Sequence, residues 1–328
     1  MKLVVIVGPT ASGKTALACE LAERLDAEIV SADSQQCYRG LDQGTAKPTL
    51  VERARARHHL LDVADPEEQL DAAVFVKLAE AAMTDIAGRG KRVILAGGTG
   101  LWIRALLHGL LAAPGASPEL RKGLRQQSLS DLHAKLQTVD QVSAQRILPG
   151  DRVRIERALE VHALSGRRLS DLQKEHGFAE VRHQALTFFL DPPRELLRQR
   201  IAARTRQLFE SGALRRETEW LLARGATKAL KIIGYGEMAE ALAAERDEQQ
   251  EPSRAFSPGR LQARSPKPEA RSRLSPLAAA EERVNARTRQ YAKRQRNWFS
   301  RDAGPPIPWP FDAKSLFEAA SRWYEGAR

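Results

Sequence analysis

The fold class follows from the first strand and loop of the chain, Leu3-Val4-Val5-Ile6-Val7-Gly8-Pro9-Thr10-Ala11-Ser12-Gly13-Lys14-Thr15. Five consecutive apolar residues predict a buried strand, and the eight residues after them fit the P-loop pattern G-x-x-x-x-G-K-S/T. Leu17, Leu21 and Leu25 then share one face of a predicted helix. A strand, a glycine-rich loop and a helix in this order are the context that the P-loop pattern requires.

The P-loop predicts an anion site. Its glycines let the backbone curl, so that successive N–H groups and the helix N-terminus point at one anion, and Lys14 adds a positive charge. The hydroxyl of Thr15 can bind Mg²⁺, and either a triphosphate or a diphosphate would suit the site. The residues expected to contact the phosphates are Gly8, Thr10, Ala11, Ser12, Gly13, Lys14 and Thr15. A Gly/Ser turn before a helix is the plain alternative.

Further short apolar runs extend the sheet. Glu28–Ala32 and Arg92–Ala96 predict strands, residues 75–86 have the spacing of a crossover helix, and Ala185–Leu190 predicts a later strand. We therefore expect an α/β fold, with a P-loop NTPase-like parallel sheet core flanked by helices and an inserted all-helical subdomain.

Domain boundaries follow from changes of pattern. The core is predicted at 1–112 and 183–328, where it includes a C-terminal basic helix. Residues 113–182 show helical but no strand patterns and predict the helical insertion, with segments at Leu120–Leu136 and Arg152–Leu164. Residues 252–276 contain five prolines and five arginines, a composition typical of a disordered insertion within the core.

Composition limits the functional class. The 328 residues carry 52 Lys+Arg against 41 Asp+Glu, and the formal charge of +11 favours a polyanionic partner. Cys19 and Cys37 lack metal or redox-motif spacing, which indicates a reducing cytoplasm. No apolar run is long enough to span a membrane, so we expect no membrane partner. We also expect a monomer.

An ordinary ATPase would place an aspartate at the end of another strand to hold its metal. The strand Arg92–Ala96 instead ends in Gly97-Gly98-Thr99-Gly100. Asp191 does follow a strand, but Pro192 and Pro193 come next, so we interpret Asp191 as a carboxylate that caps a turn. His58 and His59 are adjacent and therefore point in different directions, which argues against a shared metal site. We expect a loop or packing role for both.

A longer motif identifies a family. Asp33 follows the second strand and begins the run Asp33-Ser34-Gln35-Gln36-Cys37-Tyr38-Arg39-Gly40-Leu41-Asp42-Gln43-Gly44-Thr45-Ala46-Lys47-Pro48. This run resembles a segment of the tRNA dimethylallyltransferases, which also carry the P-loop G-P-T-A-S-G-K-T. Further similar motifs follow in the family's order, at 58–62, 97–102, 154–161 and 293–299.

The resemblance implies transfer of a dimethylallyl group from dimethylallyl diphosphate to the exocyclic amine of the adenosine adjacent to the anticodon. It implies Mg²⁺, held by Thr15 and Asp33, and a helical insertion that grips the anticodon stem-loop. Asp33 is then the base that accepts the amine proton, while Thr99 and Arg204 contact the diphosphate. The alternatives are a metal-only role for Asp33, a helix cap for Thr99 and a solvated helix face for Arg204.

A tRNA surface is expected in three segments. Gln36 would read a flipped adenine, or would be a turn residue. Residues 283–301 hold seven basic and no acidic side chains, a polyanion footprint. The residues expected to contact tRNA are Ser34, Gln35, Gln36, Arg154, Arg157, Lys293, Arg294, Gln295 and Trp298. Val153, Gly236 and Asn297 depart from the family pattern, and each departure weakens an expected tRNA contact.

Three other activities share some of these features. A P-loop small-molecule kinase would explain the phosphate site but not the basic helix. A prenyltransferase for free adenine nucleotides would not need the helical insertion. A nucleic-acid-binding NTPase would release phosphate without alkylating its partner.

Overall fold

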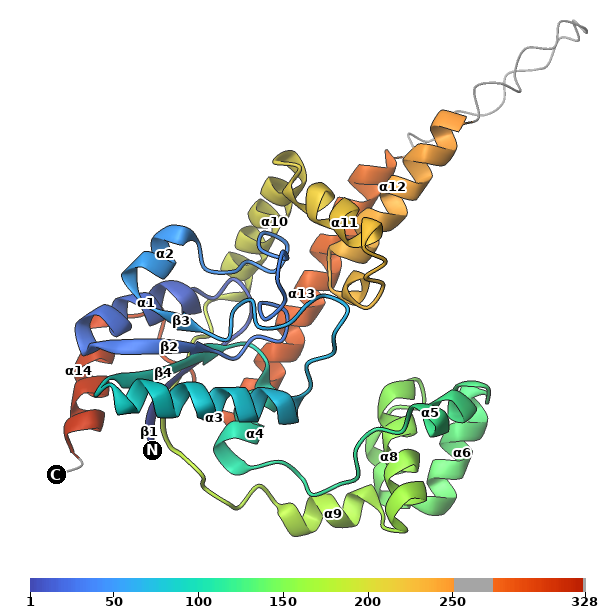
Figure 1. The fold of residues 1–328 in the computed structure, drawn as a ribbon, viewed down its shortest axis with the longest axis horizontal. Coiled ribbons are helices and arrows are strands. Elements are labelled where there is room, and N and C mark those ends of the chain that lie inside the picture. Colours follow the sequence, from blue (N-terminus) through green and yellow to red (C-terminus); the bar gives the residue numbers. More distant parts are fainter. Residues whose placement is uncertain (251–273, 327–328) are drawn as a thin grey trace, which may run out of the picture. The chain divides into compact units, whose positions relative to one another are not determined.

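The computed structural model describes residues 1–250 and 274–326 (Figure 1). Its strands form one parallel sheet in the order β3-β2-β4-β1-β5. They are β1 (Lys2–Val7), β2 (Ala27–Ser31), β3 (His58–His59), β4 (Arg92–Gly97) and β5 (Gln184–Phe189). The inner strand β1 pairs with β4 on one side and β5 on the other, and its residues from Leu3 to Val7 are buried. The predicted α/β class is confirmed.

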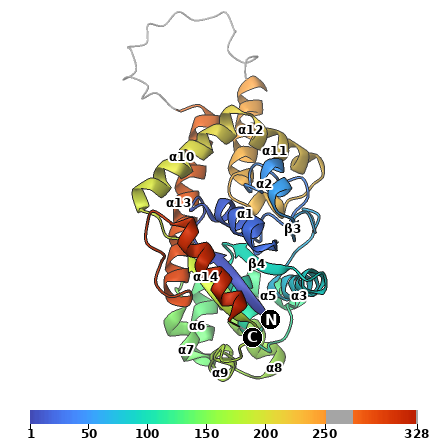
Figure 2. The same ribbon diagram turned by 90° about the vertical axis from the view of Figure 1, so that its left-hand side faces the viewer.

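Helices cover both faces of this sheet. The helices of the compact unit formed by Met1–Leu106 and His183–Arg328 are α1 (Lys14–Leu25), α2 (Leu50–Arg55), α3 (Ala72–Gly88), α4 (Gly100–His108, up to Leu106), α10 (Arg194–Glu210), α11 (Ala213–Ala223), α12 (Tyr235–Gln250), α13 (Pro276–Asp302) and α14 (Ala313–Glu325). Helices α1 and α14 lie side by side, and Leu17, Leu21 and Leu316 share one buried cluster (Figure 2). On α3, Phe75 stacks on Trp102 of α4 with ring centroids 4.5 Å apart.

The long helix α13 packs against α10 and α12 and brings its residues to the sheet. Ser275 caps it by accepting a hydrogen bond from the Ala278 N–H at 3.2 Å, and Pro276 occupies its first turn. The insertion predicted at 252–276 therefore ends too late, because Pro276 is helical. Residues 252–273 of that prediction lie outside the described residues. No helix in the described ranges is long and apolar enough to cross a membrane.

A second compact unit spans Leu107–Arg182 and begins earlier than the expected boundary at 113. It consists of α5 (Pro118–Arg125), α6 (Leu129–Val139), α7 (Gln141–Arg146), α8 (Arg152–Ser165) and α9 (Leu169–His176). The predicted segment Leu120–Leu136 is two helices, because Ser128 accepts a hydrogen bond from the Asp131 N–H at 3.1 Å and starts α6. Leu132, Leu136 and Ile155 are fully buried in its core.

Glu160 of α8 is a buried charge at the centre of this unit. Its carboxylate accepts hydrogen bonds from Nε and Nη2 of Arg121, from Nη1 of Arg157 and from the Ser117 N–H, each at 2.8 Å. Burial raises the pKa of Glu160, but the hydrogen bonds from Arg121 and Arg157 outweigh it and lower the pKa to about 2. The buried carboxylate therefore stays ionised and ties α8 to α5.

These contacts bear on two expected tRNA residues. Arg157 donates to Glu160 and, at 2.7 Å, to the carbonyl of Pro114, so its guanidinium is engaged within the helical unit. The prediction assigned the Arg157 side chain to tRNA, whereas here it binds groups of its own unit. Arg154 has an exposed side chain whose ion pair is with Asp151 at 3.1 Å, and it remains available to a partner.

Candidate active site

The P-loop folds as a glycine-dependent turn between β1 and α1. Gly8 and Gly13 have φ angles of +151° and +96°, which side chains other than hydrogen rarely allow. A Cβ on Gly8 would also lie 2.3 Å from the carbonyl oxygen of Leu190. The Ser12 N–H donates to the Pro9 carbonyl at 3.2 Å, and the Lys14 ammonium donates to the same oxygen at 2.8 Å.

The P-loop forms one wall of a cavity of about 490 Å³. Thr10–Ala16 line it together with Asp33, with Arg204 of α10 and with Tyr291 of α13, so segments distant in sequence converge. The aliphatic side chains of Leu208, Leu214, Ile233 and Val284 also line it. A cavity lined both by a cationic loop and by aliphatic side chains suits a ligand with an anionic head and an apolar tail.

Three charges interact inside this cavity. Burial lowers the pKa of Lys14 to about 8, with Asp33 opposing and Arg204 reinforcing the shift. Burial also lowers the pKa of Arg204, against the stabilising charge of Asp33. Oδ1 of Asp33 accepts a hydrogen bond from the Gln35 N–H at 2.9 Å. With Arg200 and Glu52, which also line the cavity, three cations face two carboxylates, and the net positive charge favours a bound anion.

Thr99 stabilises the backbone beside Asp33. Its Oγ1 accepts a hydrogen bond from the Ser34 N–H at 3.0 Å and donates to Ser34 Oγ at 3.2 Å. Thr99 also directly precedes α4, and its carbonyl accepts hydrogen bonds from the N–H groups of Trp102 at 3.0 Å and Ile103 at 3.2 Å. The position of a helix cap and the contact with Ser34 are therefore combined in one residue. Thr99 and Gly8 do not line the cavity, whereas the predicted phosphate residues Thr10, Ala11, Ser12, Gly13, Lys14 and Thr15 do.

The oxygen donors needed for Mg²⁺ are present in part. Thr15 and Asp33 both line the cavity, and the hydroxyl of Ser12 is buried without a hydrogen-bond partner. In residues 1–250 and 274–326 no three His, Cys, Asp or Glu side chains are grouped as a metal site. The residues thus fit a Mg²⁺ ion that takes most of its ligands from phosphate oxygens and water, the usual mode for this ion.

Gln295 links α13 to the P-loop. The side chain is 5% exposed; its Oε1 accepts from the Thr10 N–H at 2.8 Å and its Nε2 donates to the Gly98 carbonyl at 3.0 Å. Both ends of the amide are therefore used inside the protein, which differs from the predicted tRNA contact. Gln295 supports the phosphate site, and nothing in the basic run around it indicates this role.

We expect Gln295→Met to weaken the phosphate site. The variant leaves the Thr10 N–H and the Gly98 carbonyl without their partner, and each unsatisfied buried group costs about 1–3 kcal/mol. Urea unfolding and titration with inorganic diphosphate should show lower stability and weaker binding. Gln290→Met, an exposed change on the same helix, is the control, and equal effects of the two changes would contradict the role of Gln295.

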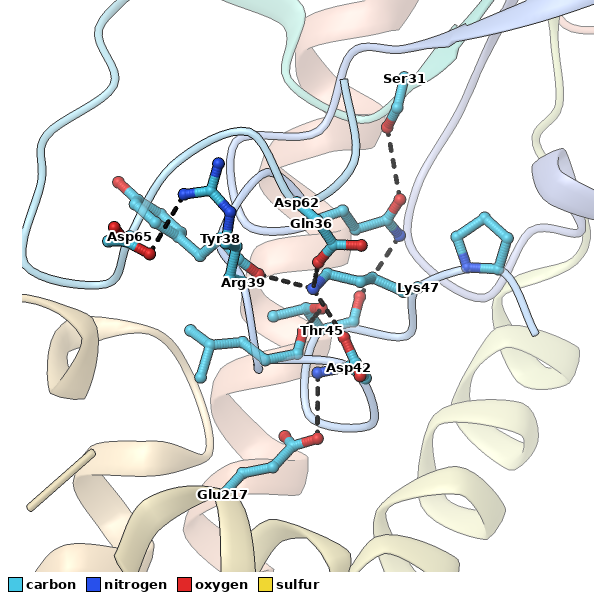
Figure 3. Close-up of polar contacts among 12 residues, drawn as sticks. Ser31, Gln36, Tyr38, Arg39, Asp42, Thr45, Lys47, Asp62, Asp65 and Glu217 are labelled. Atoms are coloured by element: carbon cyan, nitrogen blue, oxygen red, sulfur yellow. Dashed lines mark hydrogen bonds and ion pairs between the residues drawn. The ribbon is translucent and has the colours of Figure 1, made fainter. Parts of the chain in front are cut away.

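Gln36 organises its own loop (Figure 3). Its Oε1 accepts from the Ser31 hydroxyl at 3.4 Å and its Nε2 donates to the Ala46 carbonyl at 2.9 Å. The amide of Gln36 therefore holds its own loop together, as expected of a turn residue. It is not a free group of the kind that would read a base. Gln35 lines the cavity, and Ser34 is bonded to Thr99.

The basic run of α13 is partly neutralised by acids from other elements. Arg283 pairs with Glu240 at 3.3 Å, Arg287 with Glu237, and Arg296 with Asp191 at 2.5 Å. The sequence gives no sign of these partners. Asp191 therefore does not cap a turn, and that prediction is wrong, because its carboxylate binds an arginine of α13.

The remaining cations of the run are Arg289, Lys293, Arg294 and Arg301, which have no carboxylate partner among the described residues. Arg294 lies over the ring of Tyr291, with its guanidinium carbon 5.7 Å from the centroid. Trp298 is covered in the same way by Arg104, at 4.4 Å, so one face of this indole is already engaged. The free positive charge on α13 is smaller than the run of seven suggests.

Arg200 and Tyr291 are among the cavity residues that the sequence prediction did not assign to the site. Arg200, one helical turn before Arg204, lines the cavity and donates to the Ala11 carbonyl of the P-loop at 3.2 Å. Its i, i+4 spacing from Arg204 is a signal that could have identified it. Tyr291 also lines the cavity, and burial raises the pKa of its hydroxyl.

His58 and His59 have structural roles. The Nε2 of His59 lies 2.6 Å from Oε2 of Glu28, and the Nδ1 of His58 lies 2.8 Å from the Ala56 carbonyl. These contacts place both histidines in the packing role that their sequence context indicated.

Comparisons with known proteins extend over the whole chain. A family model described as IPP transferase matches residues 36–302. A curated tRNA dimethylallyltransferase from Anaeromyxobacter dehalogenans (strain 2CP-C) is 47% identical over 325 residues, which cover 96% of this chain and 98% of the relative. One from Geobacter metallireducens is 45% identical over 309 residues, 92% of this chain and 90% of the relative.

Solved structures agree. The full-length tRNA isopentenylpyrophosphate transferase of Bacillus halodurans matches with a TM-score of 0.66 and 30% identity, over 99% of this chain and 97% of that one. A eukaryotic dimethylallyltransferase acting on tRNA matches with a TM-score of 0.77 and 24% identity, over 100% of this chain and 80% of that one, and shows the shared fold. The family model and the full-length relatives confirm the resemblance, and the chain belongs to the IPP transferase family.

Proposed function

We propose that the protein transfers a dimethylallyl group from dimethylallyl diphosphate to the exocyclic amine of the adenosine adjacent to the anticodon in tRNA, and releases diphosphate. The observation that carries the proposal is that one cavity is lined by the P-loop, by Asp33 and Arg204, and by aliphatic side chains such as Leu208 and Val284. The names of the relatives, tRNA dimethylallyltransferases, support it.

The reaction makes one bond and breaks one. The amine nitrogen attacks the allylic carbon, the carbon–oxygen bond to the diphosphate breaks, and the amine loses a proton. An adenine amine is a weak nucleophile, so a base at the attacked side and cations at the leaving group both lower the barrier. Asp33 accepts the proton, and Lys14 and Arg204 stabilise the charge that develops on the diphosphate oxygens.

Thr15 and Asp33 would hold Mg²⁺, which neutralises charge on the diphosphate when bound. Backbone N–H groups at the start of α1 would donate to the same oxygens. The aliphatic side chains of Leu208 and Val284, which line the cavity, would accommodate the dimethylallyl chain and keep water from the reacting carbon. Each part of the donor then has a matching part of the cavity.

We expect Gln35, Arg154, Lys293 and Arg294 to contact tRNA, because their polar groups are not used up by bonds among the described residues. Ser34 and Trp298 contribute groups that are already partly engaged. Free cations on α13 attract phosphates, and the +11 charge steers the polyanion. We place the protein in the cytoplasm, as a monomer, where unmodified tRNA and the allylic diphosphate are both present.

Family membership does not favour the small-molecule kinase. The deciding test is an acceptor panel with dimethylallyl diphosphate and Mg²⁺: unmodified tRNA, AMP, and metabolites supplied with ATP. We expect diphosphate release only with tRNA, and loss of release on chelation of Mg²⁺. Prenylated AMP would support the free-nucleotide enzyme, and ATP consumption with a metabolite would support the kinase.

Removing free charge from α13 should reduce the salt dependence of tRNA binding. Lys293→Ala and Arg294→Ala each lose a cation without an acidic partner, so the slope of log affinity against log salt should fall by about one per variant. Arg283→Ala, whose cation is paired with Glu240 on the same surface, should change the slope less. Equal slopes for all three variants would contradict tRNA contact by Lys293 and Arg294.

A further inference from the structure

The loop that follows Asp33 is held in shape by a buried ammonium group (Figure 3). The Lys47 side chain is 1% exposed, and its Nζ donates to Oδ1 of Asp42 at 2.7 Å, to Oδ1 of Asp62 at 2.5 Å and to the Tyr38 carbonyl at 2.6 Å. An ammonium group has three donors, and all three are used. Lys47 therefore fixes both ends of the segment from Tyr38 to Lys47.

A carboxylate from α11 fixes the middle of the same loop. Oε1 of Glu217 accepts from the N–H groups of Asp42 at 3.0 Å and Gln43 at 2.8 Å, and Oε2 accepts from the Gly44 N–H at 3.1 Å. Oε2 also accepts from the hydroxyl of the buried Tyr235 at 2.6 Å. Three successive N–H groups around one carboxylate form an anion nest, here filled by the protein itself.

Gly44 connects this nest to the cavity. Its N–H is held by Glu217, and its carbonyl accepts from Nη2 of Arg204 at 3.3 Å. A Cβ on Gly44 would lie 2.4 Å from the Tyr235 hydroxyl, so the backbone packs directly on that side chain. Gly44 and Arg204 both line the cavity, and the position of the guanidinium therefore depends on the position of one peptide unit.

We propose that Glu217, Tyr235 and Lys47 are positioning residues, which place the Arg204 guanidinium against the diphosphate by fixing the backbone at Gly44. The identity of the anion rests on the proposed function. Helix α11 does not need this carboxylate for packing, because its buried residues are Ala213, Leu214, Thr218 and Leu221. The contacts of Glu217 all go to the loop and to Tyr235.

Glu217→Gln tests the proposal directly. The change turns one acceptor oxygen into an NH₂ donor that faces N–H or O–H donors, while size and shape are retained. The matched control is Glu219→Gln on the same helix, whose carboxylate is exposed and pairs with Arg215 at 3.1 Å. Both variants are measured alone and in the Arg204→Ala background, with Mg²⁺ and inorganic diphosphate as the binding probe and single-turnover prenyl transfer as the rate.

We expect Glu217→Gln to weaken diphosphate binding and slow transfer by about tenfold, and to add less than about twofold in the Arg204→Ala background, because residues that act through one another are non-additive. Glu219→Gln should change neither quantity. Full additivity with Arg204→Ala, or an effect no larger than that of the control, would overturn the proposal. If Glu217→Gln does not fold, the same measurements are made with Tyr235→Phe, which removes one hydroxyl, alone and in the Arg204→Ala background.

The two readouts separate this inference from the proposed function. Diphosphate titration needs no acceptor, so coupling in binding without any prenyl transfer by the unaltered protein would support the positioning role and contradict the proposed reaction. Transfer onto tRNA with no coupling between Glu217 and Arg204 would support the proposed reaction and contradict the positioning role.

Discussion

Asp33→Asn is expected to slow prenyl transfer by about 10²–10⁴, the usual contribution of a positioned acid or base. The asparagine keeps the acceptor for the Gln35 N–H, so the local turn and the fold should survive. It cannot accept a proton, and it binds a divalent cation less well than a carboxylate. Single-turnover transfer to unmodified tRNA is the measurement.

The control for this variant is Asp65→Asn, which removes the same charge from an exposed carboxylate paired with Arg39. Diphosphate affinity at saturating Mg²⁺ separates the two roles of Asp33. A loss confined to the transfer rate indicates a base, whereas a parallel loss of affinity indicates the metal-only alternative. Transfer that survives within a few-fold would remove Asp33 from the chemistry.

The second large effect is on stability, in the helical unit Leu107–Arg182. Glu160→Gln removes the charge that holds Arg121 and Arg157, and breaking a buried ion pair from one side costs about 3–5 kcal/mol. Hydrogen exchange of amides in α5 and α8 of the full-length protein should show the loss locally. Glu175→Gln, an exposed carboxylate paired with Arg167 in the same unit, should have little effect.

Acid should reproduce the effect of Glu160→Gln in the unaltered protein. The pKa of Glu160 is lowered to about 2 in the folded state, so its contribution is complete above the ordinary glutamate pKa and is lost as the pH falls from there towards 2. The variant lacks the titrating group and should show a smaller change across that range. Equal acid sensitivity in both proteins would contradict the account of Glu160.

Local sequence patterns predicted the core elements. The apolar run Leu3–Val7 and the spacing of Leu17, Leu21 and Leu25 correspond to β1 and α1, and α10 has the predicted bounds Arg194–Glu210. Helix α12 was missed, although its buried residues Tyr235, Met238 and Leu242 have the i, i+3, i+7 spacing of a helix. Strand β3 has two residues, too few for any periodicity.

Side-chain roles were harder to predict than elements. Gln295 and Gln36 were assigned to tRNA because they stand in motifs, yet the amide of Gln295 bonds to Thr10 and Gly98, far away in sequence. Charge runs have the same weakness, because Asp191 and Glu237 neutralise arginines of α13 from other elements. Only the tertiary structure shows which polar groups are already satisfied.

The most direct measurement is incubation of the protein with unmodified tRNA, dimethylallyl diphosphate and Mg²⁺, followed by mass analysis of the nucleosides and mapping of the modified position. The account predicts a dimethylallyl increment on the adenosine adjacent to the anticodon, made by the unaltered protein and nearly lost in Asp33→Asn. An unmodified tRNA after incubation with the unaltered protein, or an increment that Asp33→Asn forms at the same rate, would contradict it.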